Sequence, residues 1–345
     1  MINDDFFKDQ TILITGGTGS LGRALSKWLI EEGSCRKVII FSRDEWKQWD
    51  MKQSYSYFND PKFRYFLGDV RDEKRLLRAF NEVDIVVHTA ALKQVPAAEY
   101  NPTEFIKTNV IGAMNIIDAA ISCQVKKVIA LSTDKAVNPI NLYGASKLCS
   151  DKLFVAGNSY VGARGFPTFS VVRYGNVAGS RGSLIPFWKS LIAQGINSLP
   201  ITDKRMTRFW ISLQEAVAFV INSLKTATGG EIFIPKIPSF KIEQLAEILA
   251  PGLATEVVGI REGEKLHELM IGIDDARHTL DLGDHYVIAP EMFTQSPDLL
   301  NIFLNRRKGI SLDEGFAYTS DRNTMWLEGD ELKKRLNEVI RDENL

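Results

Sequence analysis

The chain has 345 residues, 45% of them apolar and 25% charged, and its formal net charge is -1; this composition is typical of a soluble globular protein with room for one large domain or two modest ones. The balanced charge gives no electrostatic support for nucleic-acid binding, and the scattered Cys35, Cys123 and Cys149 predict neither disulfides nor a metal site. Because MINDDFFKDQ lacks the pattern of a signal peptide and no apolar run is long enough to cross a bilayer, we expect a cytoplasmic enzyme without a membrane segment.

The first predicted strand, Thr11 to Thr15, leads into a glycine-rich turn and then a helix. Gly16, Gly19 and Gly22 match G-x-x-G-x-x-G, whose missing side chains let the backbone approach a pyrophosphate at a helix N-terminus. Because the pattern directly follows an N-terminal strand, it predicts a dinucleotide site. The cofactor contacts expected here are Gly16, Thr18, Gly19, Ser20, Leu21 and Gly22.

A second strand, Lys37 to Phe41, ends about 20 residues past the last glycine, where this kind of fold contacts the adenosine ribose. Arg43 at that point favours a 2'-phosphate, and Lys47 could add to the contact, so we expect NADP. Asp44 could instead bind a ribose diol, and Arg43 could be a solvated loop charge. The residues expected at this end of the cofactor are Ser42, Arg43, Asp44, Glu45 and Lys47.

Two further strands, Phe63 to Leu67 and Ile85 to His88, bring more cofactor candidates to the same sheet edge. The first is followed by a carboxylate that could hold the adenine edge, and the second by a turn of small residues. A helix is predicted from about Pro102 to Cys123. The expected contacts in these segments are Asp69, Val70, Thr89, Ala90, Ala91, Lys93, Thr108 and Asn109.

The segment from Lys127 to Lys147 contains the candidate catalytic residues. Its buried strand ends in Ser132, and ligands bind at the carboxyl ends of such strands. Tyr143 begins a helix and lies four residues before Lys147, so that the lysine ammonium could favour the phenolate and make the tyrosine a base. A surface tyrosine and a plain Asp-Lys salt bridge are the alternatives. The candidates are Thr133, Asp134, Lys135, Tyr143 and Lys147.

The alternation of strands and helices predicts an α/β protein with an NAD(P)-binding Rossmann fold and a doubly wound parallel sheet. A sixth strand, Thr168 to Arg173, precedes a glycine-rich loop. We expect residues 1–183 to form mainly the NADP-binding domain, and 184–345 mainly a smaller, discontinuous substrate lobe and tail, with the two interleaved. Loop arginines such as Arg205 and Arg208 could clamp a diphosphate there. The amphipathic stretch GDELKKRLNEVI could either pack against the rest of the chain or form an oligomer contact.

TGGTGSLG, Asn109, Thr133 and Tyr143-x-x-x-Lys147 resemble the extended short-chain dehydrogenase/reductase superfamily. ALKQVPAAEYNP, STDKAVNPINLYGASK, RYGNVAGSRGS, ITDKRMTRFW and GIREGEKLHE are more closely similar to the inverting UDP-N-acetylglucosamine 4,6-dehydratases that open pseudaminic acid biosynthesis. Retaining relatives often carry a methionine in place of Tyr143, and many are tethered by membrane segments; this chain has neither feature.

The resemblance implies an NADP-dependent homo-oligomer acting on UDP-N-acetylglucosamine. Tyr143 would take the C4 hydroxyl proton as hydride leaves C4. Lys135, if its pKa is lowered, would take the C5 proton while Asp134 protonates the departing C6 hydroxyl. Hydride returns to C6 and C5 is inverted, which gives UDP-2-acetamido-2,6-dideoxy-β-L-arabino-hex-4-ulose. The implied sugar-nucleotide contacts are Lys93, Lys135, Asn176, Arg181, Thr202, Arg205, Arg261 and Glu264, with Val177 at the cofactor.

The competing interpretations use the same scaffold. One is a nucleotide-sugar epimerase, and another is a retaining dehydratase or one acting on a different UDP-hexose. A non-catalytic NADP-sensing protein is disfavoured, because such proteins typically lose the tyrosine or lysine that this chain keeps as Tyr143 and Lys147. A side activity as a C5 epimerase on the keto product is also consistent with a base that removes the C5 proton.

Overall fold

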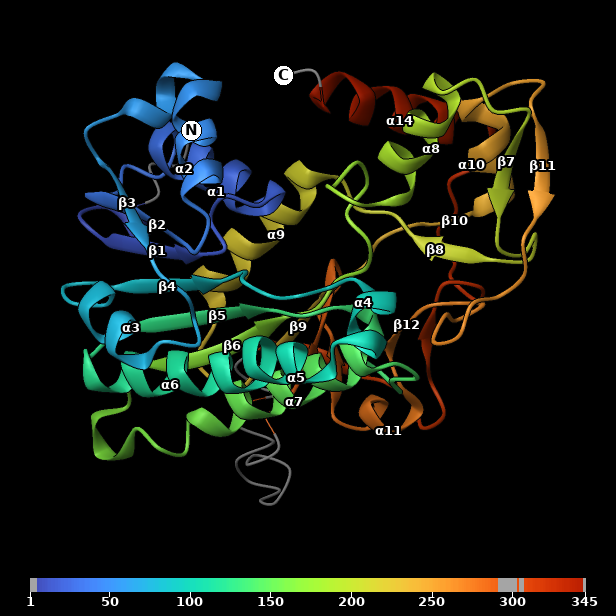
Figure 1. Cartoon of the computed structure of the whole chain (residues 1–345). Helices are drawn as coiled ribbons and strands as arrows, with labels where there is room; N and C mark the ends of the chain where they lie inside the picture. The colour runs from blue at the N-terminus through green and yellow to red at the C-terminus, as the bar shows by residue number, and fades with distance from the viewer. Residues whose placement is uncertain (1–4, 291–302, 304–306, 344–345) are drawn as a thin grey trace.

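A computed structural model of the chain describes residues 5–290, 303 and 307–343 (Figure 1). Ten strands of these residues form one sheet. They are β1 (Thr11–Thr15), β2 (Lys37–Ser42), β3 (Phe63–Leu67), β4 (Ile85–His88), β5 (Lys127–Leu131), β6 (Thr168–Val172), β9 (Ile232–Pro235), β13 (Thr279–Asp281), β14 (His285–Ile288) and β15 (Ile310–Ser311). Their order is β15-β13-β14-β9-β6-β5-β4-β1-β2-β3.

The seven strands from β3 to β9 run parallel, whereas β14, β13 and β15 add an antiparallel margin. Every residue of β1 and β4 is buried, because helices cover both faces of a parallel sheet. The predicted doubly wound Rossmann fold is therefore confirmed. The antiparallel margin and β9 come from the part of the chain after residue 183, so this sheet draws on both halves of the sequence.

Helices lie on both faces of the sheet (Figure 1). On one side are α1 (Ser20–Glu31), α2 (Glu45–Ser54) and α9 (Leu213–Thr226), and α1 packs against α9. On the other are α3 (Glu73–Ala79), α6 (Gly112–Ser122) and α7 (Leu142–Gly157), with α6 packed between α3 and α7. This double layer leaves the carboxyl edge of the strands as the open rim where ligands bind in such folds.

The predicted helix from Pro102 to Cys123 is not one regular α-helix. It consists of α5 (Pro102–Phe105), a π-helical segment, Ile106–Ile111, and α6. Such wide turns insert an extra residue and recur at functional sites. Here the segment carries Asn109, whose amide accepts a hydrogen bond from the Leu92 N–H and donates to the Leu92 carbonyl, both at 2.9 Å. The π-helical turn thus fixes the loop that follows β4.

A second, smaller lobe contains α8 (Leu184–Ala193), β7 (Ser198–Ile201), β8 (Thr207–Phe209), β10 (Ser239–Lys241), α10 (Ile242–Leu249), β11 (Ala254–Val257) and α14 (Gly329–Glu343). These elements enclose an apolar cluster of their own around Trp188 and Trp210. Leu332 and Leu336 of α14 are buried in it, and α14 packs against α10. The amphipathic stretch near the end of the chain therefore packs within its own chain, because its apolar face covers this cluster.

The remaining elements are short. They are α4 (Val95–Tyr100), α11 (Ile273–Ala276), the antiparallel pair of β12 (Leu269–Ile271) with β16 (Tyr318–Thr319), and 3₁₀ turns at 5–7, 56–59, 134–136 and 162–164. Across the ranges that the structure describes, no helix is long and apolar enough to span a membrane. The same ranges hold no group of three or more metal-ligating side chains, and the three cysteines are unbridged.

Candidate active site

The glycine turn lies directly on the end of β4. Gly16 has φ +66°, and a Cβ on it would stand 2.8 Å from the backbone nitrogen of Ala90. A Cβ on Gly22 would come within 2.6 Å of the Gly17 Cα, so glycine is what lets α1 pack this closely on the turn. Gly19 is the N-cap of α1 and makes no side-chain cap hydrogen bond. The first turn of α1 therefore keeps backbone N–H groups for an anionic ligand.

At the end of β2, a carboxylate and two cations lie close together. Asp44 is the N-cap of α2: its Oδ1 accepts from the Lys47 N–H at 3.0 Å, and its Oδ2 lies 3.3 Å from the Lys47 Nζ. These contacts, with the backbone hydrogen bond the largest, lower the pKa of Asp44. Arg43 beside it is exposed, as is Glu45 in the first turn of α2. Helix capping thus already occupies much of the Asp44 carboxylate.

The other predicted cofactor residues lie along the same carboxyl edge. Asp69 binds the Arg71 guanidinium at 2.7 Å, and Val70 is buried beneath it. Thr89 donates to the Thr15 carbonyl at 2.6 Å, which ties the turn after β4 to β1. The hydroxyl oxygen of buried Thr108 has no hydrogen-bond partner within the described chain. The remaining residues of this set belong to the same turns: Ser20, Leu21, Ser42, Ala90 and Ala91.

The carboxyl end of β5 turns sharply into the next helix. Thr133 caps the 3₁₀ turn Asp134–Ala136, and its hydroxyl donates to the Asp134 Oδ1 at 2.9 Å. A Cβ on Gly144 would lie only 2.1 Å from the Lys135 carbonyl oxygen, so the first turn of α7 packs directly on this 3₁₀ turn. The close approach brings Tyr143 of α7 next to Thr133, whose side chain acts to lower the pKa of the phenol.

Tyr143 and Lys147 are both buried on α7. Burial raises the pKa of Tyr143 to about 12, against the opposing influences of Lys135 and of Thr133. The pKa of Lys147 is lowered, first by burial, while Asp151 works in the other direction. The Tyr143 phenol is thus harder to ionise in the protein alone, because the loss of water around it outweighs the nearby cations, and the effect of Lys147 on it stays a prediction.

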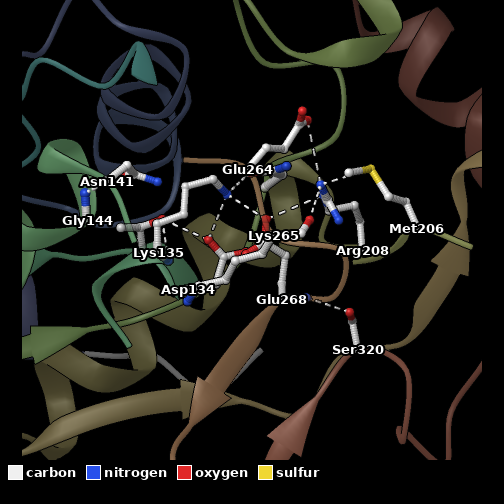
Figure 2. A network of polar contacts seen from close by, with 12 residues as sticks. Asp134, Lys135, Asn141, Gly144, Met206, Arg208, Glu264, Lys265, Glu268 and Ser320 are labelled. Atoms are coloured by element: carbon white, nitrogen blue, oxygen red, sulfur yellow. Dashed lines mark hydrogen bonds and ion pairs between the residues drawn. The ribbon is translucent and has the colours of Figure 1, made fainter. Parts of the chain in front are cut away.

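Lys135 lies between two carboxylates (Figure 2). Its Nζ is 3.1 Å from the Asp134 Oδ1 and 3.0 Å from the Glu268 Oε1. Burial acts to lower the pKa of Lys135, but the two carboxylates outweigh it, so the pKa is raised. The lowered value that a resting base requires is thus contradicted. Burial, together with the charge of Glu268, raises the pKa of Asp134, as a proton donor needs.

Two adjoining cavities open beside this cluster. One, of about 150 Å³, is largely apolar and lies in the second lobe, lined by Phe187, Trp188 and Trp210 among others. The other, also about 150 Å³, is lined by Lys135 and Glu268. They share the polar residues Asn176, Arg208, Arg261 and Glu264. The polar cluster around Lys135 therefore adjoins an apolar cavity, and the four shared polar residues form a polar neck between them.

The predicted sugar-nucleotide residues separate into three groups. Asn176, Arg261 and Glu264 line both cavities, while Thr202 lines the apolar one, as does Val177, which is predicted at the cofactor. Lys93 donates to the Arg181 carbonyl at 3.0 Å, and the Arg181 N–H donates to the Ser20 hydroxyl at 3.3 Å, so these two join the glycine turn to the loop after β6. Arg205 lines neither cavity; its side chain is 70% exposed and pairs with Asp203.

One residue of the cluster, Glu268, is not among the predicted contacts. Arg208, predicted as one of the loop arginines that could clamp a diphosphate, lines both cavities. Glu268 is the last residue of GIREGEKLHE, and nothing local in that motif indicates that it reaches Lys135, 133 residues earlier.

The parallel sheet, the glycine turn and the Tyr143–Lys147 pair define the class of protein: a Rossmann-fold enzyme of the short-chain dehydrogenase/reductase type. The chain belongs to the family described as polysaccharide biosynthesis protein, which matches residues 12–290. This membership and the relatives below confirm the resemblance read from the motifs.

Curated relatives carry different names. The chain is 54% identical over 332 residues to a UDP-N-acetylglucosamine 4,6-dehydratase (inverting) of Campylobacter jejuni, which covers 96% of this chain and 98% of that protein. It is 42% identical over 337 residues to a UDP-glucose 4-epimerase of Rickettsia akari, with 96% of each chain covered. Among solved structures, Pen from Bacillus thuringiensis is 33% identical with a TM-score of 0.84, and covers 99% of this chain and 100% of that one.

Proposed function

We propose that the protein catalyses the NADP-dependent, inverting 4,6-dehydration of UDP-N-acetylglucosamine, the reaction that opens pseudaminic acid biosynthesis. The observation that carries the proposal is the pair of fully buried Asp134 and partly buried Lys135 beside Tyr143. A 4-epimerase needs the tyrosine but has no use for a second acid and base, whereas elimination across C5 and C6 needs both. The 54% identity to a protein named for this dehydration supports the same choice.

The residues of the carboxyl edge fit a dinucleotide. The uncapped N-terminus of α1 and the close-packed glycine turn suit the pyrophosphate, and we assign the ribose end to Arg43 and Lys47. Asp44 caps α2 and pairs with Lys47, which leaves exposed Arg43 to meet a 2'-phosphate, with Lys47 beside it, and favours NADP over NAD. When bound, the nicotinamide supplies a hydride acceptor for C4 and later a hydride donor for C6.

The chain's own residues account for the proton movements. Tyr143 accepts the C4 hydroxyl proton; with a pKa raised to about 12, it needs the cations of the complete site to do so. Asp134 is the acid for the C6 hydroxyl, in keeping with its raised pKa. Lys135 is the base for the C5 hydrogen, which the C4 ketone acidifies, and it must first lose its own proton.

The two cavities suit the two parts of a sugar nucleotide. We place the sugar beside Lys135 and Asp134, the diphosphate at the polar neck with Arg208 and Arg261, and the base in the apolar cavity. Lys93, Asn176, Arg181, Thr202, Arg205 and Glu264 complete the proposed binding residues.

We also propose that the protein works as a homo-oligomer in the cytoplasm. Apolar side chains that are 38% to 88% exposed cluster in the segment from α4 to α6, including Tyr100, Ile106, Ile111 and Met114. An exposed apolar set of this kind fits an interface with a second copy. Analytical ultracentrifugation of the purified protein checks this; a single monomeric species would contradict it.

The test of function is incubation with UDP-N-acetylglucosamine in deuterium oxide, followed by proton NMR and mass spectrometry. We expect loss of one water, deuterium at C5 and the couplings of an L-arabino ring without added cofactor. Loss of water with a D-xylo ring would contradict inversion. Unchanged mass with altered stereochemistry at C4 would make the protein an epimerase, the activity for which the Rickettsia akari relative is named.

A further inference from the structure

Glu268 lies between Lys135 and Arg208, although it is the last residue of the distant GIREGEKLHE segment. Its side chain is 2% exposed and stands just before β12. Its Oε1 contacts both the Lys135 Nζ, at 3.0 Å, and the Arg208 Nε, at 3.4 Å. Its backbone N–H donates to the Ser320 hydroxyl at 2.9 Å. Figure 2 shows Glu268 between the lysine and the arginine.

The other carboxylate oxygen of Glu268 is unused. Oε2 is buried and has no hydrogen-bond partner among the residues that the structure describes. A buried carboxylate oxygen left without a partner is costly for the folded protein, so it calls for an explanation in function. An oxygen in this state has a free lone pair that can take a proton.

The proposed chemistry places two demands on neighbouring groups at once. Lys135 must be neutral to take the C5 proton, and Asp134 must be protonated to release the C6 hydroxyl as water. If Lys135 passed its proton to the Asp134 carboxylate, that proton would also be the only one available for the C6 oxygen. The two carboxyl groups differ in the direction of their pKa shifts. Burial and Glu268 raise the pKa of Asp134, which favours its protonated form. Burial acts to raise the pKa of Glu268, but Lys135 and Arg208 outweigh it and lower the pKa, so Glu268 is the charged carboxylate that can receive a proton.

We propose that Glu268 is a positioning residue for the base: it holds the Lys135 ammonium in place and accepts its proton when the lysine becomes a base, so that Asp134 keeps a proton of its own for the leaving group. The inference rests on the proposed function. An N–H bond of Lys135 breaks as an O–H bond of Glu268 forms. The C5–H bond then breaks, its proton restores the Lys135 ammonium, and the Asp134 proton leaves with the C6 oxygen as water.

Other charged groups surround Lys135, Asp134 and Glu268 and influence their pKa values. Arg208 and Lys265 favour the Glu268 carboxylate, and Asp134 favours the Lys135 ammonium. Lys93 and Tyr143 also face Lys135, whose charge acts on both of them. Because Glu268 to Gln keeps the shape and the hydrogen-bond acceptor, it removes only the charge and the ability to take a proton.

The first test follows deuterium exchange at C5 of the keto product, made with the wild-type enzyme and then incubated with each holoenzyme in deuterium oxide. This exchange needs the base but not Asp134 as an acid. In E268Q we expect the rate at neutral pH to fall on the order of a hundredfold, and to rise with pH about tenfold per unit, because Lys135 must now lose its proton to solvent. A loss that is independent of pH, or no loss, overturns the proposal.

Two further variants separate proton acceptance from folding. E268D keeps a carboxylate. Its rate of exchange at C5 should therefore fall less than that of E268Q, and should not rise steeply with pH. E231Q is the matched control: Glu231 is also fully buried and paired with an arginine, Arg307, but lies outside the site. It should leave the exchange rate unchanged, whatever it does to the melting temperature.

A second readout does not depend on turnover. Competitive acylation of the holoenzyme at a series of pH values, followed by peptide mass spectrometry, reports where Lys135 becomes neutral. Removing the Glu268 charge lowers the pKa of Lys135, so E268Q should be acylated there at a pH lower by about one unit, and E231Q should not. An unmoved Lys135 profile overturns the inference. A wild-type enzyme that leaves UDP-N-acetylglucosamine intact overturns the proposed function alone, since the acylation result stands without it.

Discussion

Two acid–base pairs in this protein share the same chemistry and behave in opposite ways. Asp134 and Lys135 lie 3.1 Å apart at the end of β5, where the Asp134 side chain is 1% exposed. Asp203 and Arg205 lie 2.7 Å apart in a loop of the second lobe, where the Arg205 side chain is 70% exposed. The pKa of Asp134 is raised by burial and by Glu268, whereas hydrogen bonds from Arg205 lower that of Asp203 to about 2.

The difference shows that a cation alone does not decide the charge of its partner. In the exposed pair, water still solvates the carboxylate, so the arginine adds to a charge that is already stable. In the buried pair, the loss of water comes first, and a second carboxylate competes for the same lysine. The buried arrangement therefore favours a protonated carboxyl group, and the exposed one favours a carboxylate that stays charged.

The largest effect should come from breaking the buried pair. D134N removes the proton donor but keeps an oxygen near Lys135, so we expect dehydration to slow about a thousandfold while oxidation at C4 continues. Absorbance of the reduced nicotinamide then builds up as the sugar product fails to appear. D203N in the exposed pair should leave the turnover number unchanged. Dehydration by D134N at the wild-type rate would exclude Asp134 as the acid.

The pH dependence tests the raised pKa directly. Asp134 must be protonated to act, so dehydration should fall about tenfold per unit once the pH rises through its pKa, at a higher pH than an ordinary aspartate would allow. Exchange at C5 does not need this acid and should keep its rate over the same range. If the rates of dehydration and of C5 exchange fell together as the pH rises, the fall would belong to a group other than Asp134.

Exposed charges at the cofactor end should give a smaller effect. R43A removes a solvated cation next to the proposed 2'-phosphate, and we expect NADP binding to weaken roughly tenfold with little change for NAD. Calorimetric titration of the cofactor-free protein with each nucleotide measures this, and raising the salt concentration should shrink the difference. Equal weakening for both nucleotides would remove Arg43 from phosphate recognition.

The smallest effect should follow removal of the exposed cation. R205A is expected to raise the KM for UDP-N-acetylglucosamine by no more than about fivefold, since water competes for an exposed guanidinium. The melting temperature should not change, because the pair with Asp203 is on the surface. A large drop in turnover number would instead mean that Arg205 turns into the site when substrate binds.

Local sequence patterns predict most of the fold. The strand, glycine turn and helix from Thr11 onward, the strands of the parallel sheet and the start of α7 were all readable, because buried strands and glycine turns are set by residues close in sequence. The sequence does not predict the π-helical turn at Asn109, since its composition is that of an ordinary helix. Nor does it predict that α14 packs on α10, because an amphipathic face does not specify what covers it.

Residues close in the sequence specify which chemical groups meet at the carboxyl edge: Thr133, Asp134 and Lys135 follow one strand, and Tyr143 and Lys147 share one helix face. The protonation of these groups depends instead on contacts between distant segments. Burial raises the pKa of Tyr143, and Glu268, 133 residues beyond Lys135, joins the lysine through the fold of the second lobe. A pKa depends on the water excluded and the charges brought near, and both are properties of packing between distant segments.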